Sequence, residues 1–343
     1  MFSLENLIRP NVLKLSPYSS ARDEFTGEAS IWLDANENPY GTLNRYPDPY
    51  QTELKQLISE QKEIKEDRIF IGNGSDEVID LLFRVFTQPV LDKALTFSPT
   101  YGMYKVSAEI NDVELIEMPL DENFQINIDA TIPYLDDPQL KLIFICSPNN
   151  PTGNLISSEK IESVLGRFNG IVAIDEAYID FANSTSWKSK LDEYPNLIVL
   201  QTFSKARGLA AARLGIAYSN PEIISFLNKV KPPYNVSLLN QQAGIESMRN
   251  EAEIAAQIET IKFERARLVM ELQEIEQVQC IYPSDANFIL IEIEHANDVY
   301  LSLIRIGIIV RNRSKIIPNT LRISIGTEKE NNKLLEELKK LNS

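Results

Sequence analysis

Short, continuous runs of apolar residues separated by helical patterns restrict the fold of this sequence more than any other feature. The apolar runs occupy residues 69–71, 94–97, 141–146, 171–174, 197–200 and 214–218, and helical patterns occur at 50–60 and 158–168. Strands that are apolar throughout are buried on both faces, and their alternation with helices predicts a mostly parallel sheet covered on both sides. We therefore expect an α/β fold whose ligand site lies beyond the carboxyl ends of the strands.

The pattern changes after Pro232 and Pro233. There we expect a long helix at 251–275, strands at 288–293, 307–310 and 321–325, and a charged helix at 328–341. These elements predict a second, smaller α+β unit. We divide the chain into an N-terminal arm or part of the small domain (1–40), a large ligand-binding domain (41–235) and a small C-terminal domain (236–343).

The charge of the chain limits its partners. It carries 34 basic and 49 acidic side chains, which gives a net charge of −15. Nucleic acids and anionic membranes need a basic face, so we expect neither as a partner. A small anionic substrate is compatible with this charge, because a few well-placed arginines are enough to bind it.

The histidine and cysteine contents exclude certain sites and indicate a compartment. His295 is the single histidine, so we expect no histidine-based catalytic triad and no metal centre. Cys146 and Cys280 show no paired spacing, which predicts free thiols in a reducing compartment. No apolar run approaches the roughly 18 residues of a membrane span, and the first residues lack a signal-peptide core. We therefore expect a soluble, cytoplasmic protein.

The segment Gln201–Gly215, which follows the apolar run 197–200, contains a candidate nucleophile. Its polar side chains include Thr202, Ser204, Lys205 and Arg213. A lysine at the carboxyl end of a strand, among residues suited to hold a phosphate, is a candidate for forming a Schiff base. The alternative is an ordinary surface lysine on a loop.

A glycine-rich turn at 72–77, G-N-G-S-D-E, lies between the run 69–71 and an expected helix. In this arrangement the backbone N–H groups of Gly74, Ser75 and Asp76 can bind a phosphate. The alternative is a plain tight turn, in which the acidic residues suit the first turn of a helix through the macrodipole.

Polar residues follow several of the expected strands: Tyr101, Asn150, Asp175 and Lys205. Together they fit pyridoxal phosphate, which needs a lysine for its aldehyde and an acid beside its pyridine nitrogen. Lys205 suits the first task and Asp175 the second, because a buried carboxylate facing a pyridinium is a paired charge. Alone, Asp175 would be interpreted as a helix N-cap.

The remaining cofactor contacts follow from the same strand ends. Tyr178 and Asn150 are suited to donate to the phenolic oxygen of the cofactor, and Tyr101 to stack on its ring. Alone, Tyr178 would be interpreted as an aromatic residue at the rim of the core. The expected phosphate contacts are Gly74, Ser75, Asp76, Thr202, Ser204 and Arg213.

These motifs, in this order, resemble those of the fold-type I pyridoxal-phosphate-dependent aminotransferases, and most closely the histidinol-phosphate aminotransferase family. The resemblance covers nearly the whole chain. It rests on L-S-P-Y-S-S-A-R (15–22), L-D-A-N-E-N-P-Y-G (33–41), R-Y-P-D-P (45–49), G-N-G-S-D-E (72–77), S-P-T-Y-G-M-Y (98–104), S-P-N-N-P-T-G (147–153), D-E-A-Y-I-D-F (175–181), T-F-S-K-A-R-G-L-A (202–210), S-D-A-N-F (284–288) and L-R-I-S-I-G-T (321–327).

The resemblance implies a role for each matching residue. Lys205 would be the Schiff-base lysine and Asp175 the partner of the pyridine nitrogen. Tyr178 and Asn150 would contact the phenolic oxygen. Arg322 would bind the acidic group of the substrate, with Asn150 also near the substrate.

The resemblance also implies a homodimer with shared active sites. Tyr46 of one subunit would reach the cofactor phosphate of the other, and Tyr18 and Arg311 would help to hold the substrate phosphate. Two positions depart from the family pattern. Arg207 stands where an aromatic residue is common and Ala211 where glycine is common, which leaves the details of that loop open.

The implied reaction is the reversible, ping-pong conversion of histidinol phosphate and 2-oxoglutarate to imidazole-acetol phosphate and glutamate, in histidine biosynthesis. An aromatic amino acid aminotransferase and a threonine-phosphate decarboxylase would retain most of the same motifs and are the alternatives. A ligand-sensing regulator is an alternative from another class. We disfavour it because we expect no room for an appended DNA-binding domain in 343 residues.

Overall fold

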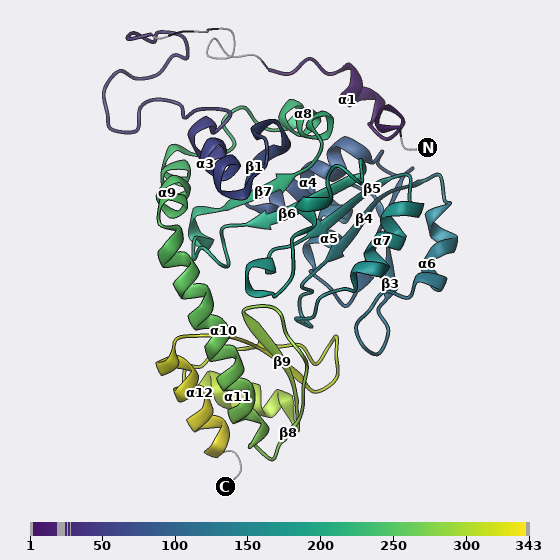
Figure 1. Ribbon diagram of the computed structural model, residues 1–343, viewed down its shortest axis with the longest axis vertical. Helices are drawn as coiled ribbons and strands as arrows, with labels where there is room; N and C mark the ends of the chain where they lie inside the picture. Colours follow the sequence, from purple (N-terminus) through teal and green to yellow (C-terminus); the bar gives the residue numbers. More distant parts are fainter. Residues whose placement is uncertain (1–2, 19–24, 26, 28, 341–343) are drawn as a thin grey trace.

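The computed structural model describes residues 3–18, 25, 27 and 29–340, which form two sheets connected by a long helix, α10 (Glu251–Gln273) (Figure 1). The larger sheet has seven strands in the order β1-β7-β6-β5-β4-β2-β3. These strands are β1 (Ile69–Asn73), β2 (Lys93–Ser98), β3 (Glu114–Pro119), β4 (Leu140–Cys146), β5 (Ile171–Asp175), β6 (Leu197–Thr202) and β7 (Leu214–Tyr218). The expected α/β fold with a mostly parallel sheet is confirmed.

The central strands are apolar throughout because both faces of the larger sheet are covered. Every residue of β5 is buried, and alternate residues point to opposite sides. Val172 and Ile174 join the core on one face, while Ile171 and Ala173 join the core on the other. Strand β7 pairs antiparallel with both β1 and β6, and the other pairs in this sheet are parallel.

Two layers of helices supply the cores on the two faces. One core takes apolar residues from α3 (Thr52–Lys62), α6 (Ile128–Leu135), α7 (Ser158–Arg167) and α9 (Leu238–Arg249). The other takes them from α4 (Ser75–Phe86), α5 (Met103–Ile110) and α8 (Pro221–Val230). Short 3₁₀ turns complete this part: η2 (Glu66–Arg68), η3 (Ile179–Phe181), η4 (Trp187–Lys190) and η5 (Ala210–Ala212).

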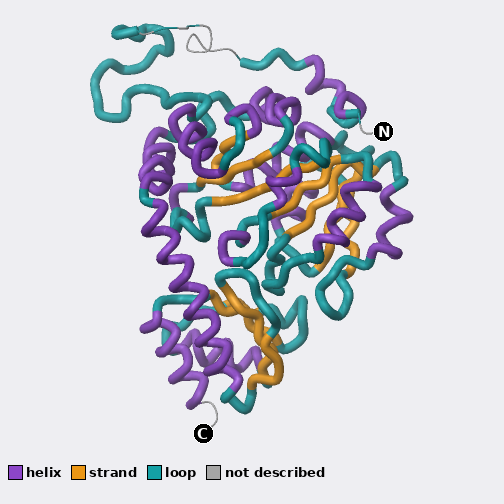
Figure 2. The backbone as a smooth tube through the Cα atoms, viewed as in Figure 1, coloured by secondary structure: helices purple, strands orange, loops and turns teal. Residues whose placement is uncertain are grey.

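The first described residues pack on the larger sheet. Turn η1 (Leu4–Asn6) and helix α1 (Pro10–Lys14) contribute Leu4, Ile8 and Val12 to the core that contains α4. This segment therefore packs on the core that covers one face of the large sheet. Most of residues 29–51 then form a loop that lies away from both sheets (Figure 2). The chain returns at Pro49 and Gln51, which are buried just before α3 begins.

The smaller unit is an antiparallel sheet in the order β10-β11-β9-β8. Its strands are β8 (Val278–Ile281), β9 (Phe288–Ile293), β10 (Arg311–Asn312) and β11 (Thr320–Ser324), and its helices besides α10 are α11 (Ala296–Arg305) and α12 (Glu328–Lys340). In β11, Leu321 and Ile323 face the apolar core shared with these helices. The period of two in a strand therefore turns Arg322 to the opposite face.

The prediction of a strand at 307–310 is wrong. Gly307 has a φ of +81° and the N–H of Ile308 donates to the carbonyl of Leu303, so these residues end helix α11. Strand pairing begins at Arg311, opposite Arg322 of β11. Leu341, the expected end of the last helix, and Ser19–Arg22 of the first motif lie outside the described residues. Within the described part of the chain, no helix has both the length and the apolar character needed to cross a membrane.

Candidate active site

A cavity of about 150 Å³ lies beyond the carboxyl ends of the central parallel strands. It collects residues from the ends of β4, β5 and β6, from the turn before α4 and from the loop after β2. Its lining consists of Ser75, Asp76, Tyr101, Cys146, Asn150, Asp175, Ala177, Tyr178, Thr202, Ser204, Lys205, Ala210 and Arg213. The structure therefore brings together most of the candidate residues that the sequence predicts, although they come from distant segments.

Asp175, the last residue of β5, is a buried carboxylate with a fixed orientation. Its exposed fraction is 2%, and its Oδ2 accepts a hydrogen bond of 2.8 Å from the hydroxyl of Tyr104. Its Oδ1 accepts a hydrogen bond of 3.0 Å from the N–H of Ala177. Burial raises the pKa of Asp175, and these two hydrogen bonds oppose the rise. Such a carboxylate favours a cationic or N–H partner in the cavity.

Lys205, three residues after the end of β6, lines the same cavity as Asp175. Its Nζ is 5.7 Å from the centroid of the Tyr178 ring. Burial lowers the pKa of Lys205, the positive charge of Arg322 lowers it further, and Asp175 opposes both effects. Because a neutral amine is the nucleophilic form of lysine, this environment increases the reactivity of Lys205.

Tyr178 and Asn150 form a polar pair at the rim of the cavity. The Nδ2 of Asn150 is 3.4 Å from the hydroxyl of Tyr178, and its Oδ1 accepts a hydrogen bond from Nη1 of Arg322. The Tyr178 ring meets Phe288 of β9 edge-on, with 5.1 Å between centroids. Arg322 and Phe288 both belong to the small sheet, so side chains of both sheets meet beside the cavity, at Asn150 and Tyr178.

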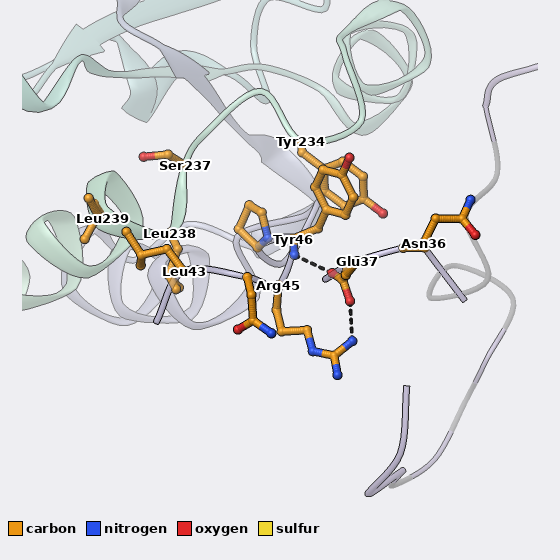
Figure 3. Close-up of a pocket in the computed structure, with 12 residues that line it drawn as sticks. Asn36, Glu37, Leu43, Arg45, Tyr46, Tyr234, Ser237, Leu238 and Leu239 are labelled. Atoms are coloured by element: carbon orange, nitrogen blue, oxygen red, sulfur yellow. Dashed lines mark hydrogen bonds and ion pairs between the residues drawn. The ribbon is translucent and has the colours of Figure 1, made fainter. Parts of the chain in front are cut away.

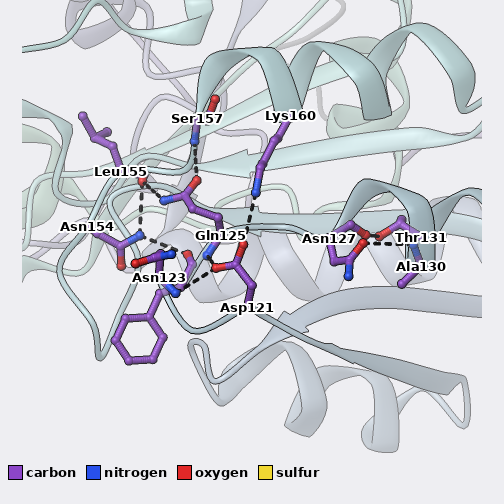
Figure 4. Close-up of polar contacts among 11 residues, drawn as sticks. Asp121, Asn123, Gln125, Asn127, Ala130, Thr131, Asn154, Leu155, Ser157 and Lys160 are labelled. Atoms are coloured by element: carbon purple, nitrogen blue, oxygen red, sulfur yellow. Dashed lines mark hydrogen bonds and ion pairs between the residues drawn. The ribbon is translucent and has the colours of Figure 1, made fainter.

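The loop that carries Asn150 is held at its far end by the loop that follows β3 (Figure 4). Gln125 bridges the two: its Nε2 donates to the carbonyl of Leu155 over 2.9 Å, and its Oε1 accepts from the N–H of Ser157 over 2.8 Å. Asn154 Nδ2 donates to the carbonyl of Phe124. These bonds satisfy polar groups of both loops and limit how far the Asn150 loop can shift.

The turn before α4 and Arg213 form a candidate anion site. Gly74 has a φ of +86°, a backbone conformation that favours glycine. A Cβ atom there would lie 2.6 Å from Nη2 of Arg213, so a side chain would force the guanidinium to move. The N–H of Gly74 donates to the carbonyl of Gly72, so this group is already used. The N–H groups of Ser75 and Asp76 open helix α4, where first-turn N–H groups have no acceptor within the helix.

The two hydroxyls before Lys205 differ in their contacts. Thr202 Oγ1 donates to the carbonyl of Leu214 over 3.1 Å and accepts from the N–H of Ser204. Ser204 Oγ lies 3.5 Å from Nη1 of Arg213, so the hydroxyl and the guanidinium point to the same place. On the other side, Tyr101 donates to Oδ1 of Asp76 over 3.0 Å.

Five predicted site residues are not among those that line this cavity. Gly74 and Arg322 lie beside it, next to Ser75 and hydrogen-bonded to Asn150 respectively, and the other three are Tyr46, Tyr18 and Arg311. Tyr46 lines a separate cavity of about 420 Å³, where its ring stacks on Tyr234 with 4.4 Å between centroids (Figure 3). Tyr18 is 70% exposed and lines a small pocket near Pro49 and Lys231. Arg311 is exposed and lies opposite Arg322 in the β10–β11 pair.

The sequence analysis missed several residues that shape the site. Tyr104 orients Asp175, and Cys146 lines the cavity beside it. Glu176 accepts hydrogen bonds from Ser186 and Trp187 and so anchors the segment after η3; burial raises its pKa to about 7. The one available signal was position, because Tyr104 belongs to the S-P-T-Y-G-M-Y motif and Glu176 follows Asp175 directly.

The two departures from the family pattern have different surroundings. Arg207 donates to the carbonyl of Ser247 over 3.0 Å and forms an ion pair of 2.6 Å with Glu251, where α9 gives way to α10. Ala211 lies exposed in η5. In the described residues, no group of three or more histidine, cysteine, aspartate or glutamate side chains is arranged to hold a metal ion.

The chain matches one family model and is similar to several named proteins and solved structures. The sequence matches the model of the family "Aminotransferase class I and II" over residues 19–338. It is 51% identical to the histidinol-phosphate aminotransferase of Christiangramia forsetii, over 99% of this chain and 98% of that protein. It is 50% identical to the enzyme of the same name from Cytophaga hutchinsonii, over 98% and 99%. The crystal structure of the histidinol-phosphate aminotransferase from Clostridium acetobutylicum matches with a TM-score of 0.79 and 29% identity, covering 87% of this chain and 91% of that one.

Proposed function

The chain belongs to the class I and II aminotransferase family, and we propose that within it the protein is a histidinol-phosphate transaminase. It would convert histidinol phosphate and 2-oxoglutarate to imidazole-acetol phosphate and glutamate, reversibly, in histidine biosynthesis. The observation that carries this proposal is that about half of the residues are identical to those of histidinol-phosphate aminotransferases over nearly the full length of the chain.

The chemistry of the cavity fits pyridoxal phosphate. When bound, the cofactor supplies an electron-withdrawing ring that stabilises negative charge at the Cα of an amino substrate. The fit rests on a nucleophilic lysine, a buried carboxylate held by two donors, and a guanidinium beside the open end of α4. Phosphate would be held by Ser75, Asp76, Thr202, Ser204 and Arg213, with Gly74 leaving space for Arg213.

The other side chains would hold the ring of the cofactor. Lys205 would bind its aldehyde covalently, and Asp175 would keep its pyridine nitrogen protonated. Tyr178 and Asn150 would donate to its phenolic oxygen, and Tyr101 would stack on its ring. Each of these side chains lines the cavity.

Lys205 would also move the proton that the reaction requires. Its amine would accept the proton from the substrate Cα as a general base and then donate it as a general acid. The pKa of Lys205 is lowered, first by burial and then by Arg322, so a larger fraction of the amine is available as a base near neutral pH. Asp175 stays fixed by Tyr104 and Ala177 throughout, which preserves the orientation of the ring.

Arg322 would bind the acidic group of both substrates. Its guanidinium is held by Asn150 at the rim of the cavity and lies over the Phe288 ring, 5.1 Å from the centroid. The α-carboxylate of glutamate and the phosphate of histidinol phosphate occupy corresponding positions relative to the reacting amine. One arginine can therefore serve both half-reactions. Tyr18 and Arg311 would add contacts to the phosphate.

We further propose a homodimer with shared active sites, located in the cytoplasm. Tyr46 of each subunit would contact the cofactor phosphate of the other. In support of this, Tyr46 does not line its own subunit's cavity and is about half exposed, and the 29–51 segment that carries it has further exposed apolar side chains. These include Ile31, Leu33, Tyr40 and Leu43.

The direct test is to supply the purified protein and pyridoxal phosphate with histidinol phosphate and 2-oxoglutarate and to measure glutamate. We expect turnover with this pair and little with phenylalanine. Threonine phosphate should release no carbon dioxide. Faster turnover of phenylalanine, or release of carbon dioxide from threonine phosphate, would favour the corresponding alternative.

An Arg322 variant tests whether this arginine binds both substrates, and a control variant measures the nonspecific effect of losing an arginine. Arg322→Ala should weaken both half-reactions, since the same guanidinium binds both acidic groups. Arg305→Ala, at the exposed end of α11, is the matched control and should change neither. Loss of one half-reaction alone in Arg322→Ala would contradict a shared role.

A further inference from the structure

Three arginines share one face of the β10–β11 ribbon. Arg311 pairs directly with Arg322, and the N–H of Arg313 donates to the carbonyl of Thr320 in the same antiparallel register. Residues 311 and 313 therefore point to the same side of the ribbon as residue 322. The other side carries Leu321, which belongs to the core of the small unit. The arginine side faces the cavity that contains Lys205, because Arg322 bonds to Asn150 there.

The cluster is short of acceptors. Among the residues that the structure describes, no carboxylate lies within ion-pair distance of these three guanidinium groups. The buried Nε atoms of Arg313 and Arg322 and the buried Oγ of Ser314 also have no hydrogen-bond partner in that part of the chain. Buried donors without acceptors are rare in folded proteins. Two such arginine donors on one face of the ribbon, with the hydroxyl of Ser314 next to Arg313 in the chain, indicate a missing acceptor.

Electrostatics supports the same conclusion. Like charges placed directly opposite in an antiparallel pair destabilise it, and Arg311 faces Arg322 in this way. Burial lowers the pKa of Arg313, and the charges of Arg322 and Arg311 lower it further, so the three groups lie close enough to repel one another. An anion with more than one negative charge would relieve this repulsion.

We propose that Arg313, with Ser314, is a specificity-determining part of the substrate site that binds the phosphate monoester of the amino substrate. This inference rests on the proposed function. Arg322 alone is sufficient for the single charge of a carboxylate. A phosphate carries about two negative charges and three acceptor oxygens, so it can use the additional guanidinium and the free hydroxyl.

The assignment predicts an asymmetric effect on the two substrates. Arg313→Gln should raise the KM for histidinol phosphate by about 10- to 100-fold, as expected for the loss of a charge-assisted hydrogen bond. The kcat should change much less, because Arg313 contacts a group remote from the reacting amine. The KM for glutamate should stay within about threefold, because its α-carboxylate, which takes the place of the phosphate, carries a single charge that Arg322 binds.

The experiment compares wild type, Arg313→Gln, Arg313→Lys and the matched control Arg305→Gln in both half-reactions. Arg313→Lys keeps the charge but loses the planar fork, so it should recover part of the loss. Equal effects on both substrates, or no effect on either, would overturn the proposal. If Arg313→Gln fails to fold, the same criteria apply to Arg313→Lys, whose KM for histidinol phosphate alone should rise.

Inorganic phosphate separates this inference from the proposed function. It should inhibit the glutamate half-reaction of the wild-type protein competitively, and Arg313→Gln should weaken that inhibition at least about tenfold. A wild type that does not turn over histidinol phosphate would refute the proposed function. The phosphate result would then still decide whether Arg313 belongs to an anion site. Unchanged inhibition in Arg313→Gln would refute the inference while leaving the transaminase proposal intact.

Discussion

Replacing Tyr104 with phenylalanine tests whether the orientation of Asp175 matters for cofactor binding. Tyr104 is fully buried, stacks on Phe144 with 4.9 Å between centroids, and donates its hydroxyl to Oδ2 of Asp175 over 2.8 Å. The variant keeps the ring and its packing and removes one hydroxyl. Asp175 then retains the hydrogen bond from Ala177.

The size of the effect follows from the nature of the acceptor. A hydrogen bond to a charged group contributes about 1.5–3 kcal/mol. Binding of the cofactor requires an ionised Asp175 that pairs with a protonated pyridine nitrogen. The binding free energy should therefore fall by the same amount. Affinity for pyridoxal phosphate should therefore fall about 10- to 100-fold. The hydroxyl of Tyr104 lowers the pKa of Asp175, so its removal should raise that pKa further. The loss of affinity should be largest at low pH and should shrink as pH rises.

The assay is a cofactor titration of the apoprotein, followed by absorbance at several pH values, together with urea unfolding. Tyr218→Phe is a matched control, because the Tyr218 hydroxyl is also fully buried but has no hydrogen-bond partner in the described residues. That variant should keep its cofactor affinity and lose little or no stability. Equal cofactor affinity in Tyr104→Phe and wild type, at all pH values, would refute the orienting role.

Three further predictions address other parts of the molecule. Lys205→Ala should abolish turnover and the absorbance band of the bound cofactor without lowering the urea midpoint; a retained band would contradict the lysine assignment. Burial and Lys231 lower the pKa of Lys55 from 10.5 to about 8, so the unfolded chain binds more protons between these values and stability should rise with pH across that window. Lys55→Met should remove this rise and add about 1–3 kcal/mol to the free energy of unfolding at pH 7; a stability curve like that of wild type would contradict it. Arg207→Gln and Glu251→Gln should each cost about 1 kcal/mol, and the double variant no more than the larger single loss; fully additive losses would exclude a coupled pair.

The sequence predicts the larger sheet well because buried parallel strands are apolar without interruption. Strand β5, I-V-A-I-D, has no solvent-facing side, so its pattern is unmistakable and its last residue marks the site. Strand β3 at the edge carries Glu114 and Glu117 and gives no such run, so it was not predicted. At 307–310 the apolar residues follow a helix end and lack a partner strand, which residue type alone does not reveal.

The candidate site, like the fold, could be predicted from the sequence only in part. Residues at the ends of strands converge because the sheet is parallel, and this could be inferred from their order in the chain. The hydrogen bond from Tyr104 to Asp175 joins residues 71 positions apart, and no local pattern encodes it. The placement of Arg313 on the same face as Arg322 depends on the register of β10 with β11, which is fixed only when the ribbon forms. The cofactor and substrate roles of these residues stay predictions.

The attachment of Arg322 to the small sheet, while Lys205 follows a strand of the large one, has a consequence for engineering. The proposed chemistry and the proposed selection of substrate reside on separate pieces of backbone that meet at Asn150. A mutant library confined to residues 311–324 could therefore search for acceptance of new amino donors without altering any side chain that lines the Lys205 cavity. With this arrangement, the substrate preference can change while the reactive centre is kept.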